Sequence, residues 1–533
     1  MPRQASAAQS CQSCRRLKRR CSREVPACSL ASIVFTLLFA WKLTWEMIKC
    51  VRLSKECQYP AKALEENLED QDKESLILMV QQLERQLKQS RQTPQDNIAR
   101  PLNPFPTAFF LDPEFFTPIA HSTFNIGYPI PLSIIDYLGS DMELICQQYF
   151  STIHTWFPFM SKKMVVKNVM NYQDEPQASL ALLIVCMRLA SDLPGAGCPS
   201  SPDYLSAKEL QHSLEAAGRI SLPLLQAIML LGLYEIGHGI LPAGYLTLGQ
   251  AARVGTLMGL HCRKNITSLF KSPDTWSLRE EERRTWWCII ILENYINLGP
   301  KGLASATPEP CQGHLLPVND RLWDMGEIGP NESLYTIGFS SVTNISQFAR
   351  TSQAAHILGR VLYHRADYNQ PDRLDRVKEA LQLHYTLSAL ESYIVQARIA
   401  ALEETLNCSI DMALCCSARL TLYDMYGCNE PDDLVYANQS RYAEESEMQA
   451  ISLKNIVEVV SGPVLELAHG VLLAEKGGLE TMSPLLVECI YHAATECQWF
   501  LRENDSGMMQ RSFGILIHAL RVLHGRWRVA GQY

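Results

Sequence analysis

The chain has 533 residues, of which 47% are hydrophobic and 20% charged, so most of it can bury a core, which excludes a disordered protein. Its net charge of −8 conceals an asymmetry, because residues 1–60 contain 11 Lys or Arg and 3 Asp or Glu, whereas the remainder contains 37 basic and 53 acidic residues. A small basic head on a large acidic body excludes a protein that coats nucleic acid along its length and indicates a head that binds a polyanion.

Six cysteines in the basic head have the spacing of a metal site. They are Cys11, Cys14, Cys21, Cys28, Cys50 and Cys57. Thiolates are soft ligands suited to zinc, and six of them can serve two tetrahedral ions only if two thiolates bridge. Five positive charges lie between the second and third cysteines, on Arg15, Arg16, Lys18, Arg19 and Arg20. These charges would neutralise phosphates and could reach a guanine edge in the major groove.

The head resembles the fungal six-cysteine binuclear zinc cluster family, a family of DNA-binding domains. The residues that carry the resemblance are Cys14-Arg15-Arg16-Leu17-Lys18-Arg19-Arg20-Cys21, followed by Pro26, Cys28, Cys57 and Tyr59-Pro60. It implies that Cys11 and Cys28 bridge two zinc ions, that Cys14 and Cys21 complete one site, and that Cys50 and Cys57 complete the other. It also implies that Lys18 reads a base edge of a CGG-like half-site in double-stranded DNA while the neighbouring arginines hold phosphates. Leu17 departs from a position that is commonly basic.

An apolar insertion at residues 31–49 interrupts the cluster, since the family has two residues between the fourth and fifth cysteines and this chain has twenty-one. Removing residues 31–49 restores the family spacing, and nineteen codons are 57 nucleotides, a multiple of three. We therefore interpret 31–49 as a retained intron. A real inserted loop is an alternative, although its exposed apolar side chains would favour aggregation. A membrane segment is a third, but the continuous apolar core is shorter than the ~20 residues that a span requires, so we expect no membrane partner.

Two connecting segments follow the zinc-cluster domain, 1–60. Residues 61–90 combine a polar stretch with a short helix in which Leu76, Val80, Leu83 and Leu87 are spaced as a heptad seam. We expect this short coiled coil to form a homodimer, and packing of the helix on its own body is the alternative. Residues 91–131 are rich in proline, which predicts a linker without regular structure.

The rest of the chain is predicted to be an all-α body, so the fold class is mainly α. The domains predicted within it are a regulatory domain at 132–428, an acidic surface loop at 429–449 and a C-terminal helical region at 450–533. Helical periodicity is found at 134–150, 178–190, 222–236, 244–261, 281–298, 352–368, 373–399, 410–426, 450–475, 482–503 and 507–529. Because residues 284–292 are apolar almost all round after Arg284, we expect a central, buried helix there. We expect most of the twelve cysteines outside the head to be free, buried thiols.

Part of the body resembles the middle homology region of fungal zinc-cluster factors, an all-α regulatory domain. The motifs are Tyr149-Phe150 with Trp156-Phe157-Pro158, the stretch Gly244-Tyr245-Leu246 through Ala251-Ala252-Arg253 to Met258-Gly259-Leu260-His261, and Glu281-Glu282-Arg283-Arg284-Thr285-Trp286-Trp287. Glu293 departs from the usual Asp. From the residues alone we expect the two tryptophans to be core, and Arg283 and Arg284 to pair with Glu281, Glu282 or Glu293. An effector pocket follows by analogy only.

These observations predict a nuclear, zinc-dependent, sequence-specific DNA-binding transcription factor. It would regulate RNA polymerase II genes of a metabolic or secondary-metabolite pathway, with two zinc ions as cofactors. The alternative is a helical interaction or regulatory protein that does not bind DNA, because the cluster is interrupted. We do not expect an enzyme, since the sequence contains no Walker phosphate loop, His-Glu-x-x-His, Gly-x-Ser-x-Gly or dinucleotide Gly-x-Gly-x-x-Gly.

Overall fold

The structure is a computed structural model. It describes residues 105–532 except for 113, 121–126, 140, 173–176, 196, 263–266, 300–302, 312, 335–344, 367–372, 401–408, 428–442 and 504–506. The chain divides into two compact units, Met1–Arg100 and Pro101–Tyr533, and every described residue belongs to the second. The predictions for 1–104, including the zinc cluster, the insertion and the heptad seam, lie outside the described residues.

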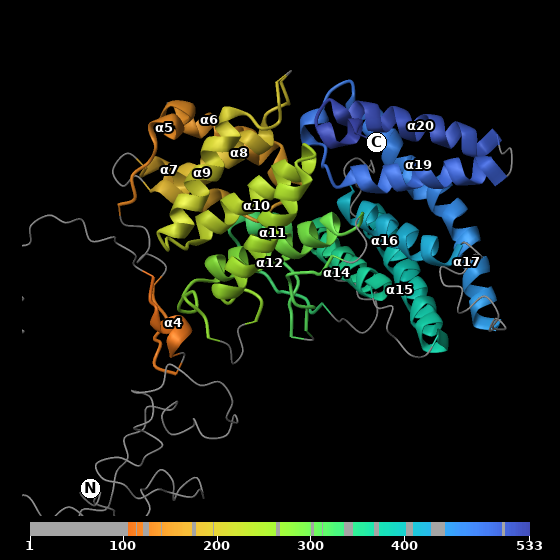
Figure 1. Ribbon diagram of the computed structural model, residues 1–533, viewed down its shortest axis with the longest axis horizontal. Coiled ribbons are helices and arrows are strands. Elements are labelled where there is room, and N and C mark those ends of the chain that lie inside the picture. Colours follow the sequence, from red (N-terminus) through yellow and green to blue (C-terminus); the bar gives the residue numbers. More distant parts are fainter. Residues whose placement is uncertain are drawn as a thin grey trace, which may run out of the picture. The chain divides into compact units, whose positions relative to one another are not determined.

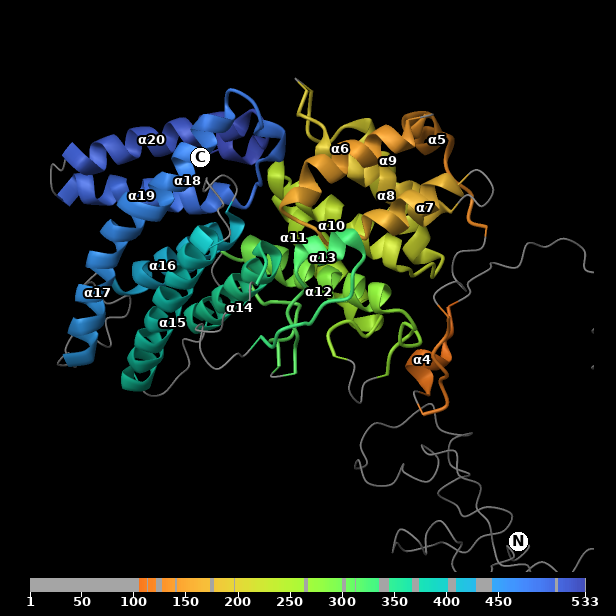
Figure 2. The same ribbon diagram turned by 180° about the vertical axis from the view of Figure 1, so that it is seen from behind.

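The described residues are mostly α-helical, as the sequence predicted (Figures 1 and 2). The α-helices are α4 Ala108–Leu111, α5 Leu132–Leu138, α6 Met142–Ser151, α7 Lys162–Met170, α8 Ala178–Ser191, α9 Pro202–Ala216, α10 Leu222–Gly237, α11 Leu241–Leu257, α12 Trp276–Ile296, α13 Asp320–Met325, α14 Gln347–Ala366, α15 Arg373–Ala400, α16 Ile410–Gly427, α17 Ala443–Val459, α18 Leu465–Ala474, α19 Leu486–Glu503 and α20 Gly507–His524. The short helical turns are η4 Ile153–Thr155, η5 Val460–Val464, η6 Leu479–Thr481 and η7 Arg528–Gly531. Among these residues, β-pairing is limited to two isolated bridges, Ile119–Phe270 and Leu315–Ser333.

Several helices begin at a hydroxyl cap that the sequence carries. At the starts of α9, α10 and α12, the side-chain oxygens of Ser201, Ser221 and Thr275 each accept a hydrogen bond from the backbone N–H of the residue three positions later. Each cap satisfies one of the backbone N–H groups that the first turn of a helix leaves unpaired. These three hydroxyl residues therefore set the N-terminal ends of α9, α10 and α12.

The hydrophobic core is centred on α10, α12 and α16. Almost every residue of α10 from Leu222 to Gly237 is buried, and α12 is buried from Arg284 to Tyr295, which confirms the central helix predicted there. Helix α10 packs on α8 and α11, and α12 packs on α11 and α14. Helix α16 packs on α14, α15, α17 and α19. Figures 1 and 2 show α10–α12 between α5–α9 and α14–α16.

Some predicted boundaries were wrong. The expected helix at 134–150 is two helices, because the chain turns at Gly139 with a positive φ of 55°. The predicted linker at 91–131 is not free of regular structure: it contains α4, and Ile119 exchanges backbone hydrogen bonds with Leu269 and Lys271. The predicted acidic loop at 429–449 ends earlier, since α17 begins at Ala443 and its first turn contains two glutamates, a favourable charge at a helix N-terminus.

The C-terminal region completes the same core as the helices before it. The indole Nε1 of Trp527 donates to the carbonyl oxygen of Met482 at 2.8 Å, and its ring lies directly against Gly237 of α10. The guanidinium of Arg526 donates to the carbonyl oxygens of Ala190 and Asp192, at the end of α8. Residues more than 330 positions apart in the sequence therefore share one packed interface.

Two further features bear on the sequence predictions. Of the ten described cysteines, seven are buried, two are exposed (Cys198 and Cys311) and Cys262 is half-buried, and none of the ten is in a disulfide. The expectation of mostly buried thiols outside disulfides is confirmed for these residues. One stretch in the described part, Ala443–Ala474, is long and apolar enough to cross a membrane, but 44% of its most apolar window is buried. A core helix passes the same test, so this is weak evidence for a span.

Candidate functional site

The predicted DNA-reading site cannot be placed in space, because all of its members precede the described residues. These are the six cysteines, Cys11, Cys14, Cys21, Cys28, Cys50 and Cys57; the basic residues Arg15, Arg16, Lys18, Arg19 and Arg20; and the seam residues Leu76, Val80, Leu83 and Leu87. Their roles stay predictions. The structure does describe the second group of motifs, those of the regulatory body.

Arg284 is the centre of these body motifs, and its side chain is fully buried. Its guanidinium donates to the carbonyl oxygens of Pro158 and Val318, both at 2.7 Å. It also lies 3.0 Å from the carboxylate of Asp320. The rings of Trp323 and Phe348 lie 5.1 and 5.4 Å from its central carbon, within range of a cation–π attraction. One planar cation thus joins α12 to the Trp-Phe-Pro motif and to the segment before α13.

Glu280, one turn before Arg284, is the buried partner of this cation. The Nε atom of Arg284 donates to Glu280 at 3.1 Å, and Arg283 donates to the same carboxylate. The backbone N–H of Val318 and the amide of Asn331 donate to it at 2.8 and 3.0 Å. Among the interactions described, the prediction that the two arginines pair with Glu281, Glu282 or Glu293 was wrong, because Glu280 lies three and four residues back on the same helical face.

The other acidic residues of the motif hold backbone segments in place. Glu281 is buried, accepts hydrogen bonds from the N–H of Ser161 and the amide of Gln226, and has a pKa raised by burial. Glu293 is also buried and accepts the backbone N–H groups of Ala306 and Thr307. These carboxylates fix α12 to its neighbours by satisfying buried donors.

The two tryptophans of the motif are core residues, as predicted. Trp286 and Trp287 are 2% and 1% exposed, and the indole of Trp287 donates to the carbonyl oxygen of Leu315 at 3.0 Å. The motif at the end of α11 is equally structural. Gly259 has a φ of 81°, and the N–H of Leu260 returns to the carbonyl of Gly255, which closes the helix with a left-handed glycine.

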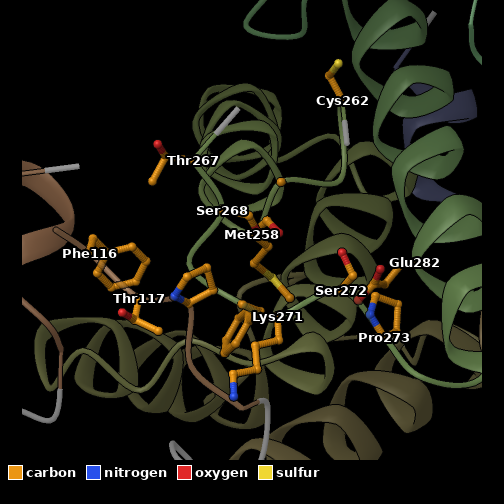
Figure 3. Close-up of a pocket in the computed structure, with 13 residues that line it drawn as sticks. Phe116, Thr117, Met258, Cys262, Thr267, Ser268, Lys271, Ser272, Pro273 and Glu282 are labelled. Carbon is orange, nitrogen blue, oxygen red and sulfur yellow. Dashed lines mark hydrogen bonds between the residues drawn. The ribbon is translucent and has the colours of Figure 1, made fainter. Parts of the chain in front are cut away.

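A pocket of about 600 Å³ lies beside this helix end. Figure 3 shows Phe116 and Thr117, from the segment that the sequence predicted to be a linker, on one side of the pocket and Met258 and Glu282 on the other. The linker is held there by the backbone bridge between Ile119 and the strand-like segment at 269–271. A pocket of this volume accommodates a small molecule.

The chemistry of the pocket is mixed. Its walls combine the aromatic side chain of Phe116, the hydroxyls of Thr117 and Ser272, the thiol of Cys262 and the ammonium of Lys271. Within the part of the chain that the structure describes, this ammonium makes no ion pair. Because the carboxylate of Glu282 also lines the pocket, the combination suits a compact ligand that has an apolar portion and both hydrogen-bond donors and acceptors. Sequence reasoning gave no signal for the pocket, because its two sides are about 140 residues apart.

Comparisons with known proteins agree with these motifs. Residues 146–391 match the family described as "Fungal specific transcription factor domain". "Transcription factor BOA15" of Botryotinia fuckeliana (strain B05.10) is 33% identical over 178 residues, which are 33% of this chain and 98% of that protein. The family match at 146–391 contains Arg284, Glu280 and both tryptophans.

Two more distant relatives have names that refer to biosynthetic gene clusters. "Depudecin biosynthesis cluster-specific transcription activator DEP6" of Fusarium langsethiae is 25% identical over 30% of this chain and 27% of that protein. "Azaphilone cluster-specific transcription factor azaR" of Aspergillus niger is 24% identical over 42% of this chain and 50% of that protein. The chain spans half the length of these two relatives or less. No solved structure matches the chain.

Proposed function

The chain belongs to the family of fungal transcription factors that contain the fungal specific transcription factor domain, and from that membership we propose that it is a zinc-dependent, sequence-specific DNA-binding regulator acting in the nucleus. Two zinc ions would be held by the six cysteines of the head, with Lys18 at a base edge of a CGG-like half-site. A homodimer formed through Leu76, Val80, Leu83 and Leu87 would present two such heads to RNA polymerase II promoters.

The observation that carries the proposal is the family match over 146–391 in a chain whose head has six cysteines around a basic run. The targets we propose are the genes of one metabolic or secondary-metabolite pathway. This part rests on relatives whose names tie them to the depudecin and azaphilone clusters.

The test is DNA binding by the full chain, purified with and without residues 31–49 and measured by fluorescence anisotropy on a duplex with two CGG half-sites. We expect the chain without 31–49 to bind two zinc ions and to lose DNA binding after zinc chelation or in Cys14→Ala, because a structural zinc site holds its domain folded. Undiminished binding after chelation would overturn zinc dependence. Sequencing the transcript across codons 30–50 shows which of the two chains the cell makes.

The interruption of the cluster favours a second candidate, a helical regulatory protein that does not bind DNA. If the transcript retains codons 31–49, that chain should bind fewer than two zinc ions and should not discriminate the CGG duplex from a scrambled one. Two zinc ions in the uninterrupted and the interrupted chain alike would exclude this candidate.

We propose that a small-molecule effector binds in the pocket between Phe116 and Met258. A ligand there would touch both the segment that leads to the head and the body, so its binding could alter how the two are coupled. Thr117→Trp fills the pocket from an exposed position of its wall and should abolish ligand-dependent changes in reporter expression while the unliganded protein still binds DNA.

A further inference from the structure

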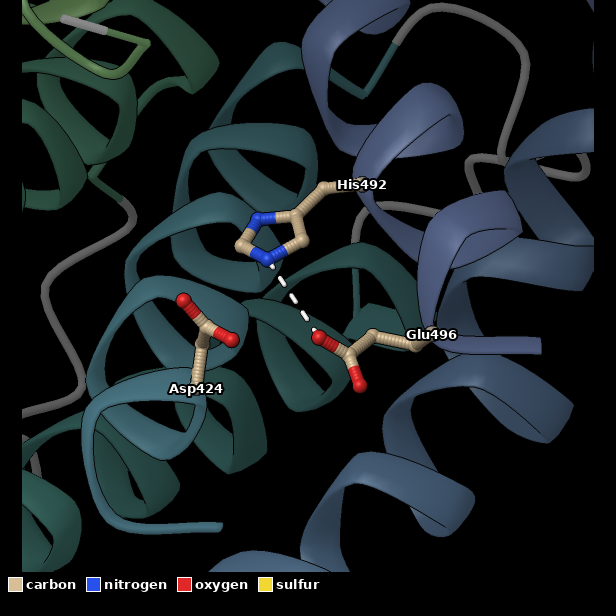
Figure 4. Close-up of side chains that lie close together, drawn as sticks. All are labelled: Asp424, His492 and Glu496. Carbon is tan, nitrogen blue, oxygen red and sulfur yellow. Dashed lines mark ion pairs between the residues drawn. The ribbon is translucent and has the colours of Figure 1, made fainter. Parts of the chain in front are cut away.

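Three side chains that can ligate a metal converge between α16 and α19, on the opposite half of the body from the pocket. His492 and Glu496 are one turn apart on α19, and Asp424 lies near the end of α16. Their ligand atoms all lie within 4.8 Å of one another. Figure 4 shows the imidazole and both carboxylates directed into the same space.

The interactions among the three residues leave much of their ligating capacity unused. The Nε2 atom of His492 lies 3.5 Å from a carboxylate oxygen of Glu496, longer than the 2.7–2.9 Å of a charge-assisted hydrogen bond. Two donors on one tetrahedral zinc ion are about 3.4 Å apart, because each bond is about 2.1 Å long. This pair is therefore spaced more like two ligands of one ion than like a close hydrogen bond.

Burying the carboxylate of Glu496 is energetically unfavourable unless a cation lies close to it. Glu496 is 8% exposed, and within the described part of the chain its ion pair is the one with His492. Asp424 is exposed and makes no hydrogen bond or ion pair with any residue that the structure describes. A buried carboxylate with one long contact beside a free one is a concentration of negative charge that a cation would relieve.

We propose that Asp424, His492 and Glu496 bind a divalent transition-metal ion of the manganese-to-zinc class and that the ion joins α16 to α19. One nitrogen and two carboxylate oxygens suit such ions, whereas soft ions prefer thiolates. Asp424 lies at the solvent side, so the ion has an entry path and room for water at its remaining positions. Since α19 packs on both α16 and α20, the ion would stabilise the C-terminal half of the body.

The experiment uses the full chain and Mn²⁺, which carboxylates and imidazole bind but which a thiolate cluster disfavours. Loss of the free-ion electron paramagnetic resonance signal measures the bound ion. We expect one bound Mn²⁺ per chain and a rise in the midpoint of thermal unfolding with Mn²⁺ concentration, because the ion binds the folded state. Asp424→Asn should weaken binding about tenfold or more, and His492→Ala should remove it.

The controls separate binding from folding. Asp424 is exposed, so Asp424→Asn should leave the circular dichroism spectrum and the metal-free unfolding midpoint unchanged. His518→Ala, an exposed histidine on α20, should bind Mn²⁺ as the unchanged chain does. The proposal is overturned if the chain binds no Mn²⁺, or if Asp424→Asn and His492→Ala both bind it with the affinity of the unchanged chain. Either result is independent of zinc in the head.

Discussion

Replacing Arg284 by methionine should destabilise the body by about 3–5 kcal/mol, the cost of breaking a buried ion pair by removing one partner. The substitution removes the donors to the carbonyl oxygens of Pro158 and Val318 and leaves both buried acceptors without that bond. Glu280 keeps Arg283, Val318 and Asn331, so its carboxylate loses only part of its compensation. Because Glu280 keeps these contacts, we expect the loss in the free energy of unfolding to stay within about 3–5 kcal/mol.

The assay is urea unfolding of the full chain, followed by far-ultraviolet circular dichroism. Arg360→Met is the matched control, since Arg360 lies on α14 with its side chain 41% exposed and makes long ion pairs of 3.4 Å with the exposed Glu309 and 3.7 Å with the half-buried Glu379. An exposed pair contributes about 0–1 kcal/mol, so the control should lose no more than that. Arg284→Met with a loss equal to that of Arg360→Met would refute the idea that this cation organises the motif.

Two other predictions concern packing and pH. In Gly237→Ala the new Cβ would lie 2.1 Å from the ring of Trp527, which should cost about 1–3 kcal/mol or more, whereas Gly249→Ala on α11 meets nothing within 4 Å and should stabilise the helix by about 0.5–1 kcal/mol in the same urea assay. Equal effects of the two substitutions would contradict this packing. Burial, together with the charges of Arg526 and Arg528, lowers the pKa of His238 from 6.5 to about 3. The folded state therefore keeps this histidine neutral while the unfolded state binds a proton below pH 6.5, so stability should fall by about 2 kcal/mol between pH 7 and 5. His238→Leu should flatten that pH dependence, and an unchanged slope would show that other groups cause it.

The sequence predicted the parts of the body that depend on local periodicity. The all-α class and the burial of α12 could be predicted because the apolar residues have the spacing of a core helix. Helices α7 and α9 were missed, although Ser161 and Ser201 accept capping hydrogen bonds at their starts and are visible in the sequence. Their apolar faces are narrow, so a search for strong periodicity passes over them.

The partners of Arg284 could be predicted only in part. Glu280 lies four residues before it, so helical spacing alone could have found that pair. The carbonyl oxygens of Pro158 and Val318 could not be found in this way, because they lie 126 and 34 residues away and are brought close only by tertiary packing. The pocket and the cluster of Asp424 with His492 could not be predicted for the same reason, because tertiary packing brings together segments that are distant in the sequence.

The family match ends within α15, but the physical domain extends to the last described turn of the chain. Carbonyl groups at the C-terminal end of a helix have no partners within it, and Arg526 donates to that of Ala190 in α8 and to that of Asp192, the residue after α8. Trp527 fills the space that Gly237 leaves open on α10, and no residue nearer in sequence takes that place. A chain that ended at residue 391 would expose the face of α10 and leave the end of α8 without these donors. We therefore expect removal of the C-terminal helices to destabilise the regulatory body, and an effector site in its first half is best studied in a chain that retains them.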